Sequence, residues 1–337
     1  MQQRAFGRTG LSVSPVGFGS WPMSGGDRYG AIEDAEAIRA IHRALDVGVN
    51  CVDTAPAYGF GHAEEVVGQA LRGRRSQATL VTKCGLVWGP EAPAVRRDTR
   101  PASLRREIDL SLRRLQTDVI DVYLIHWPNV DTPFEDAFGT LDDIVRAGKV
   151  RFVGVSNFTV DQMEACMRIR RVDVVQVGYH LFDRRMERDV FPYCARHGIG
   201  VMGYGPLGHG LLTGTFTAAT RFADPDWRAK GFAFGQPIFS PENLPRNVAV
   251  VDRLRREVAE PLGVSMSQLA LAWVLRNPVV STALVGARSP AEVDANLAGT
   301  RLALSDATLA QIEGIMAGAA GTIRAFTPLR PAMELWE

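Results

Sequence analysis

Short apolar runs alternate with amphipathic helical patterns about eight times along this chain. Such alternation predicts a parallel sheet whose strands are joined by crossover helices. Several runs are apolar at nearly every position, as in strands that are buried on both faces. The strands are predicted at residues 16–19, 50–53, 79–83, 119–126, 151–155, 174–176, 200–204 and 282–285.

The alternation favours a single (β/α)8 barrel over two domains. A length of 337 residues would suggest about two domains. However, a barrel of this kind routinely forms a single domain of ~250 residues or more. No linker or shift in composition divides residues 1–337. A short β-hairpin, turning at residues 7–10, is predicted before the first strand. The Gly-, Pro- and aromatic-rich segment 206–245 is predicted to form a long loop on the active face after strand seven, and 320–337 a surface tail.

Charge and composition argue against several classes of partner. The net charge is +1, so no overall field favours nucleic acid or an anionic membrane. No apolar run approaches the ~20 residues that span a bilayer, and the N-terminus lacks a signal-peptide pattern. The 4 cysteines form no C-x-x-C pair and the 6 histidines have no metal-ligand spacing. We therefore expect a cytoplasmic protein without a metal; nothing in the pattern indicates its oligomeric state.

Polar side chains occur at the carboxyl ends of the predicted strands. In an α/β barrel these ends meet at one mouth. Tyr58 follows on the loop after the second strand. Each side chain alone has a structural interpretation: Asp53 could cap a helix, Lys83 could extend its amine to water, and His126 could be a satisfied core histidine. Their joint placement favours a shared site, whose strand-end members are Asp53, Lys83, His126, Ser156, Asn157, Gln176 and Tyr204.

The residue types at this mouth suggest proton transfer. A lysine that ends an apolar strand is costly to bury unless it is paired, and Asp53 on the neighbouring strand can pair Lys83. A cation beside Tyr58 would favour the phenolate and lower the pKa of the phenol from ~10, as a proton donor and acceptor near neutral pH requires. His126 could hydrogen-bond the same substrate oxygen. The predicted catalytic residues are therefore Asp53, Tyr58, Lys83 and His126.

One motif points to a different fold. Residues 203–208 match G-x-G-x-x-G after a strand, with Asp224 about twenty residues further on, as in Rossmann domains. A Rossmann domain requires a helix that begins at this glycine-rich loop. One proline and three glycines disfavour a helix start here, namely Pro206, Gly208, Gly210 and Gly214. The barrel therefore remains the prediction.

Ordered motifs across nearly the whole chain resemble those of the aldo-keto reductase family. The stretch GVNCVDTAPAYGFGHAEEVVG carries Asp53 and Tyr58, and it is followed by VTKCG, LIHWP, GVSNF, VVQVGYHLFDR, GYGPLGHGLLTG and VGARSPAEVDANL. The last two resemble the branch that includes potassium-channel β subunits and aryl-alcohol dehydrogenases. The resemblance implies NAD(P)H-dependent reduction of an aldehyde or ketone. Tyr58 would be the general acid, Lys83 and Asp53 would tune it, and His126 would orient the carbonyl.

The resemblance also implies how the ligands would be held. Ser156, Asn157 and Gln176 would hold the nicotinamide carboxamide, and Tyr204 would stack on the ring. The other implied cofactor contacts are Gly19, Ser20, Trp21, Asp53, Gly205, Pro206, Leu207, Gly208, Gly210, Gly286, Arg288, Glu292 and Asn296. The predicted substrate pocket comprises Trp21, Tyr58, Trp88, His126 and Trp127, of which Trp88 and Trp127 are placed there from their loop positions.

Two departures from the family pattern bear on the choice of cofactor. Many relatives carry a lysine that reaches the cofactor phosphates where this chain has Thr215, and an arginine or glutamine where it has Glu292. A carboxylate at 292 would repel a 2′-phosphate or accept hydrogen bonds from a ribose hydroxyl. The guanidinium of Arg288 suits a phosphate instead. We expect NADPH, with NADH also possible.

Two other functions remain open from the sequence. One is an NAD(P)⁺-dependent dehydrogenase of sugars or other secondary alcohols. The other is a cofactor-sensing regulatory subunit with little turnover. Histidine at position 126, where channel-subunit relatives often have asparagine, favours an active reductase. The sequence does not predict the physiological substrate.

Overall fold

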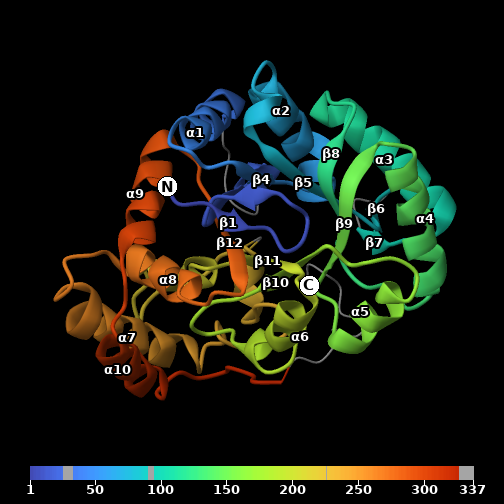
Figure 1. Ribbon diagram of the computed structural model, residues 1–337. Helices are drawn as coiled ribbons and strands as arrows, with labels where there is room; N and C mark the ends of the chain where they lie inside the picture. The colour runs from blue at the N-terminus through green and yellow to red at the C-terminus, as the bar shows by residue number, and fades with distance from the viewer. Residues whose placement is uncertain (26–32, 90–94, 225, 326–337) are drawn as a thin grey trace.

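The computed structural model describes residues 1–25, 33–89, 95–224 and 226–325. Eight parallel strands close into a barrel ringed by helices, which confirms the predicted fold (Figure 1). The barrel closes where the first strand pairs with the last, with Val16 opposite Ala283 and Gly19 opposite Gly286. In order of position along the chain, the strands are β3 (Val16–Gly19), β4 (Cys51–Asp53), β5 (Thr79–Cys84), β8 (Ile120–Ile125), β9 (Val150–Ser156), β10 (Val174–Gly178), β11 (Gly200–Tyr204) and β12 (Val280–Gly286).

The surrounding helices follow the apolar periodicity of the sequence. Capping boxes begin α5 at Thr159 and α8 at Ser265, while Gly198 in the left-handed region ends α6. One helix begins at Leu244 and continues into a π-helical turn at Arg255–Ala259. The helices are α1 (Asp34–Asp46), α2 (His62–Leu71), α3 (Pro101–Leu115), α4 (Phe134–Arg146), α5 (Val160–Met167), α6 (Val190–His197), α7 (Leu244–Leu254), α8 (Met266–Leu275), α9 (Pro290–Ala298) and α10 (Asp306–Met316).

The predicted N-terminal hairpin closes one end of the barrel. Its strands are β1 (Arg4–Ala5) and β2 (Ser12–Val13), and Figure 1 shows the hairpin across the barrel axis. Phe6 packs with the apolar side chains that fill the barrel interior. A Cβ atom at Gly7 would lie 2.4 Å from the amide nitrogen of Gly200, the first residue of β11, so this close approach needs glycine. The hairpin thus covers the amino ends of the strands, leaving the carboxyl ends to form the site.

The carboxyl face carries the irregular segments. The predicted long loop runs from residue 205 to 243, between β11 and α7, and contains short 3-10 turns at Gly208–Thr213 and Trp227–Lys230; we call it the active-face loop. No α-helix begins at the glycine motif, because the backbone is left-handed at His209 and Gly210. A small hairpin that was not predicted, β6 (Leu86–Val87) with β7 (Arg96–Arg97), follows β5.

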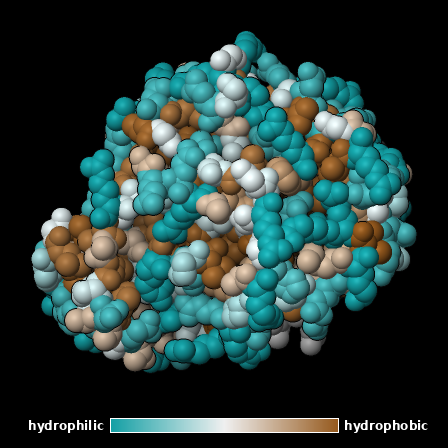
Figure 2. Space-filling view, in the orientation of Figure 1, coloured by the Kyte–Doolittle hydropathy of each residue, from teal (hydrophilic) through white to brown (hydrophobic). Residues whose placement is uncertain are grey.

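The remaining predictions concern the surface and the tail. On the hairpin side, hydrophilic and hydrophobic residues are interspersed (Figure 2). None of the helices in the described part of the chain has the length and apolarity of a membrane span. The 4 cysteines are free and buried. Of the predicted surface tail, 320–337, the part from residue 326 onward lies outside the described residues.

Candidate active site

Strand register brings the predicted acid and lysine together. Asp53 pairs with Val81 of β5, and Lys83 lies two residues further on, on the same side of the strand. Tyr58 follows β4 on a tight turn, Tyr58–Gly61, in which Gly59 has a φ of 63°. A Cβ atom at Gly59 would lie 2.4 Å from the carbonyl oxygen of Ser24, so glycine here lets the Tyr58 turn pack on the preceding loop. The predicted convergence of Asp53, Tyr58 and Lys83 is therefore present.

Lys83 is the centre of this polar cluster. Its ammonium group is fully buried and donates hydrogen bonds to both carboxylate oxygens of Asp53, at 3.0 and 2.8 Å. It also donates to the backbone oxygen of Thr54 at 2.8 Å and to Oη of Tyr58 at 3.3 Å. Gln176 donates from Nε2 to Asp53 at 2.7 Å. The lysine is thus a paired buried cation in contact with the phenol, and Asp53 does not cap a helix.

The protonation of Tyr58 differs from the prediction. Burial raises the pKa of its phenol well above the usual value, and the carboxylate of Asp53 adds to the rise. Burial likewise raises the pKa of Asp53 and lowers the pKa of Lys83, while the contact between the two opposes both shifts. The predicted net lowering of the Tyr58 pKa is wrong, because burial and the carboxylate of Asp53 outweigh the effect of the nearby ammonium. The phenol of Tyr58 is therefore uncharged at neutral pH.

His126 is the second polar group beside Tyr58. Its ring lies edge-on to the phenol, with ring centres 5.8 Å apart. Burial lowers the pKa of the imidazole well below its usual value, and the charge on Lys83 lowers it further. Nδ1 of His126 is buried without a hydrogen-bond partner in the described structure. A neutral imidazole carries one N–H group, and His126 lines the cavity, so its ring can donate a hydrogen bond to a substrate oxygen.

The next three strand ends present groups that fit a primary carboxamide on a flat ring. Nε2 of Gln176 is committed to Asp53, and its side-chain oxygen has no hydrogen-bond partner among the described residues. Ser156 accepts from Nδ2 of Asn157 at 3.0 Å, which leaves the serine hydroxyl hydrogen to donate. Oη of Tyr204 donates to Oδ1 of Asn157 at 2.9 Å, which fixes the tyrosine ring. One acceptor, one donor and an oriented aromatic ring suit a nicotinamide.

These groups line one cavity of about 250 Å³ at the carboxyl ends of the strands. The cavity continues from the nicotinamide-type groups along the glycine-rich turn after β11. The predicted site residues that line it are Gly19, Trp21, Asp53, Tyr58, His126, Trp127, Ser156, Asn157, Gln176, Tyr204, Gly205, Pro206, Leu207, Gly210 and Gly286.

Several predicted ligand contacts lie outside this lining. Trp88 packs against Phe60, with ring centres 5.5 Å apart, and not on the cavity. Arg288 and Glu292 form an ion pair with each other at 3.3 Å at the start of α9, and the amide of Arg288 also donates to Glu292 at 2.8 Å. The charges of Arg288 and Glu292 therefore largely neutralise each other. The remaining predicted contacts that do not line the cavity are Ser20, Gly208 and Asn296.

Sequence reasoning missed three notable side chains of the active-face loop that line the cavity: His209, Arg228 and Phe234. Arg228 pairs with Asp226 at 2.6 Å and donates to the backbone oxygen of His209 at 3.0 Å. These residues belong to an irregular segment with no period that assigns a side chain to the mouth. The high aromatic and Gly/Pro content of the segment was the one available signal.

A closed parallel barrel with a buried cluster of titratable side chains beside a cavity at its carboxyl face is the arrangement found in barrel enzymes. The profile of the Aldo/keto reductase family matches residues 15–317. The chain is 37% identical over 297 residues to the aldo-keto reductase YhdN of Bacillus subtilis, covering 88% of this chain and 87% of the relative. It is 34% identical over 324 residues to the NADH-specific methylglyoxal reductase of Escherichia coli, covering 91% and 96%. The chain therefore belongs to the aldo/keto reductase family.

A solved structure and a relative from the potassium-channel branch of the family support this assignment. The glycerol dehydrogenase AKR11B4 of Gluconobacter oxydans superposes with a TM-score of 0.86 at 35% identity, covering 97% of this chain and 98% of that one. A probable voltage-gated potassium channel subunit beta of Oryza sativa is 32% identical over 312 residues, covering 88% and 90%. The predicted resemblance to the branch with channel β subunits is thus confirmed.

Proposed function

We propose that the protein is an NAD(P)H-dependent oxidoreductase that reduces an aldehyde or ketone to the alcohol, with Tyr58 as the general acid. The observation that carries this proposal is the buried contact of Lys83 with Tyr58 next to His126, in a cavity whose other groups suit a nicotinamide. When bound, the reduced nicotinamide would supply the hydride that the carbonyl carbon receives.

The side chains of this chain provide the remaining chemistry. The carbonyl oxygen accepts hydrogen bonds from Tyr58 and His126 and gains negative charge as the carbon is reduced. Tyr58 gives its phenolic proton to that oxygen. The ammonium of Lys83, 3.3 Å from Oη, stabilises the phenolate that remains. Asp53 keeps Lys83 in place. These donors act from fixed positions in a buried site, where their electrostatic effect is strongest.

The pKa directions predict an asymmetric dependence on pH. The pKa of His126 is lowered from about 6.5 and that of Tyr58 is raised from about 10, so both groups stay neutral between these two values. We expect kcat for reduction to be nearly constant from about pH 6.5 to 10, where Tyr58 keeps its proton. Alcohol oxidation needs the phenolate and should increase about tenfold per pH unit over the alkaline part of this range. Initial rates in both directions test this; a fall in reduction around pH 7 would contradict it.

For the cofactor we propose NADPH, with NADH also accepted. Arg228, which lines the cavity beside Gly210 and pairs with Asp226, would be the basic side chain available to a cofactor phosphate in this part of the cavity. Arg288 has the fork geometry that suits a 2′-phosphate, while its pairing with Glu292 reduces the charge available to attract one. The pair makes the preference for NADPH a modest one.

Two titrations and a turnover assay test the proposed function. We expect NADPH, and more weakly NADH, to quench tryptophan fluorescence, because Trp21 and Trp127 line the cavity. Aldehydes and ketones should then oxidise the bound dinucleotide catalytically. Binding of either cofactor without turnover on a broad carbonyl panel would instead support the regulatory-subunit alternative. Turnover that is efficient only with alcohols and NAD(P)⁺ near neutral pH would support the dehydrogenase alternative.

A further inference from the structure

Phe234 of the active-face loop contacts aromatic rings on both sides of the cavity. Its ring centre is 6.4 Å from that of Trp21, which packs beside Tyr58, and 6.2 Å from that of Trp127, which follows His126. It is also 5.3 Å from Tyr204. Phe234 therefore reaches the part of the cavity that lies next to both proposed hydrogen-bond donors.

The same ring joins the active-face loop to a small apolar cluster at the mouth. This cluster is separate from the main core and consists of Ala57, Leu86 and Trp127, with Val95 and Phe234 packed on it. Ala57, Leu86 and Trp127 follow the second, third and fourth barrel strands, whereas Phe234 comes from the loop after the seventh. Phe234 thus bridges the two walls of the substrate side of the cavity.

The backbone of Phe234 is in the left-handed region, which a bulky aromatic residue rarely adopts. Its φ is 47°, and Gly235 follows with a φ of 82°. Ala233 and Gln236 exchange backbone hydrogen bonds of 2.8 and 3.0 Å across them. A two-residue turn with both central φ values positive prefers Asn-Gly, Asp-Gly or Gly-Gly. A bulky aromatic residue at the first of these positions is strained, and strain of this kind is concentrated at functional sites.

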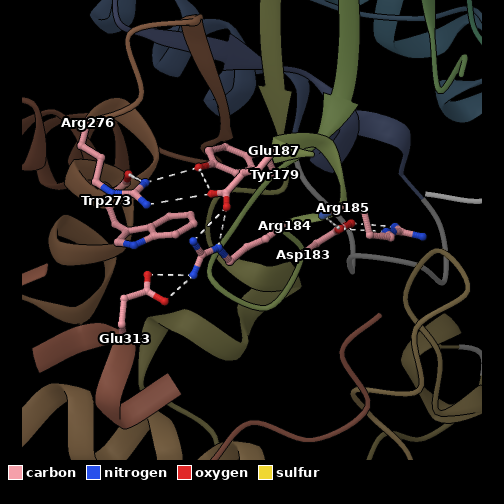
Figure 3. A network of polar contacts seen from close by, with 8 residues as sticks. All are labelled: Tyr179, Asp183, Arg184, Arg185, Glu187, Trp273, Arg276 and Glu313. Atoms are coloured by element: carbon pink, nitrogen blue, oxygen red, sulfur yellow. Dashed lines mark hydrogen bonds and ion pairs between the residues drawn. The ribbon is translucent and has the colours of Figure 1, made fainter. Parts of the chain in front are cut away.

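A buried ion pair holds this turn. Arg185 binds Asp183 through two parallel hydrogen bonds of 2.8 and 2.7 Å, and its Nη1 donates to the backbone oxygen of Phe234 at 3.2 Å. The neighbouring Arg184 points the opposite way and binds Glu187 at 2.8 Å and Glu313 of α10 (Figure 3). The segment after β10 is thus anchored to the outer helices on one side and holds the turn of Phe234 on the other.

We propose that Phe234 is a specificity-determining residue that limits the size of the carbonyl substrate, and that the Asp183–Arg185 pair is the positioning device for it. This proposal rests on the proposed function, because it concerns the substrate side of the same cavity. A small aldehyde fits under the ring, whereas a carbonyl with a fused aromatic substituent must displace it. Arg185 keeps the ring in place through the backbone oxygen of the strained turn.

The test compares the kcat/KM values for propanal and 2-naphthaldehyde in variants of the full-length protein. Phe234→Ala should raise the ratio of 2-naphthaldehyde to propanal by about 10- to 100-fold, the range over which pocket-shape changes alter discrimination. Phe234→Gly should raise the ratio by a similar factor. Because glycine adopts the left-handed conformation without strain, this second variant guards against a folding defect of Phe234→Ala. Phe232→Ala is the matched control, because Phe232 lies two residues away and is 50% exposed. Its ratio should equal the wild-type ratio.

The positioning role has its own readout. Removing both charges with Asp183→Asn plus Arg185→Met avoids leaving an uncompensated buried charge. This double variant should raise the substrate ratio in the same direction as Phe234→Ala but by less. Combined with Phe234→Ala it should add nothing, since the ring that it positions is gone. If the Asp183–Arg185 pair had only a structural role, the double variant would lower the activity on both aldehydes equally, both with Phe234 present and in the Phe234→Ala variant.

Each outcome separates this proposal from the proposed function. If the wild-type protein turns over aldehydes and binds NADPH normally while Phe234→Ala and Phe234→Gly leave the ratio within twofold, this proposal is overturned and the proposed function stands. If the wild-type protein reduces no carbonyl compound with either cofactor, both are overturned. If the ratio rises in Phe232→Ala as well, the effect belongs to general loosening of the loop and the assignment to Phe234 is wrong.

Discussion

Replacing Tyr58 with phenylalanine is expected to lower kcat for carbonyl reduction by about 10²–10⁴-fold, the contribution typical of a positioned general acid. The change removes the proton donor and leaves the aromatic ring, which packs beside Trp21 and His126. The KM for the cofactor should stay within about twofold, because the residues that suit the nicotinamide come from other strands. Steady-state kinetics with saturating NADPH measure the effect.

The matched control is Tyr193→Phe. Tyr193 is a buried tyrosine on α6 that packs against His197, with ring centres 4.3 Å apart, and does not line the cavity. Its loss of a hydroxyl group should leave kcat unchanged. If Tyr58→Phe retained kcat within about tenfold of the wild-type value while cofactor binding remained normal, Tyr58 would not be the general acid.

Replacing Lys83 with methionine is expected to damage both stability and catalysis. The carboxylate of Asp53 would lose its buried cation, and breaking a buried ion pair in this way typically costs about 3–5 kcal/mol of unfolding free energy. Tyr58 would lose the charge that stabilises its phenolate, a change comparable to loss of one oxyanion donor, about 10²–10³-fold in kcat. Urea unfolding and initial-rate kinetics measure the two effects separately.

A double-mutant cycle distinguishes the two roles of Lys83. Adding Asp53→Asn to Lys83→Met removes the uncompensated charge and should recover a large part of the lost stability. It should not recover kcat, because the phenolate of Tyr58 still lacks a neighbouring cation. Recovery of both quantities together would mean that Lys83 acts on catalysis only by maintaining the fold.

The barrel and its polar cluster could be predicted because both depend on regular features of the chain. The position of Lys83 at the end of an apolar run, with Asp53 one strand away, is enough to predict a buried pair from the sequence. The strand ends Ser156, Asn157, Gln176 and Tyr204 followed from the same rule. In the structure all of these except Lys83 line the cavity, and Lys83 lies fully buried behind it.

Other features depend on three-dimensional detail that a linear pattern does not contain. The pKa of Tyr58 is raised because desolvation and the nearby carboxylate together outweigh the lysine, a balance set by burial and distances. Strands β6 and β7 have two residues each, too few for an alternation of apolar and polar residues to be recognised in the sequence. Phe234 lies in an irregular loop, and a turn of its type normally carries asparagine, aspartate or glycine at that position.

The pairing of β3 with β12 has a consequence for how the chain is made. Residues 16–19 emerge early from the ribosome, but their partner at 283–286 is among the last strands to be synthesised. Until then the growing sheet has two unpaired borders that can join another nascent chain. Barrel closure must therefore wait for translation to pass residue 286. A product that stops before that point would retain most of the site residues yet keep an open seam, and aggregation is the fate we expect for it.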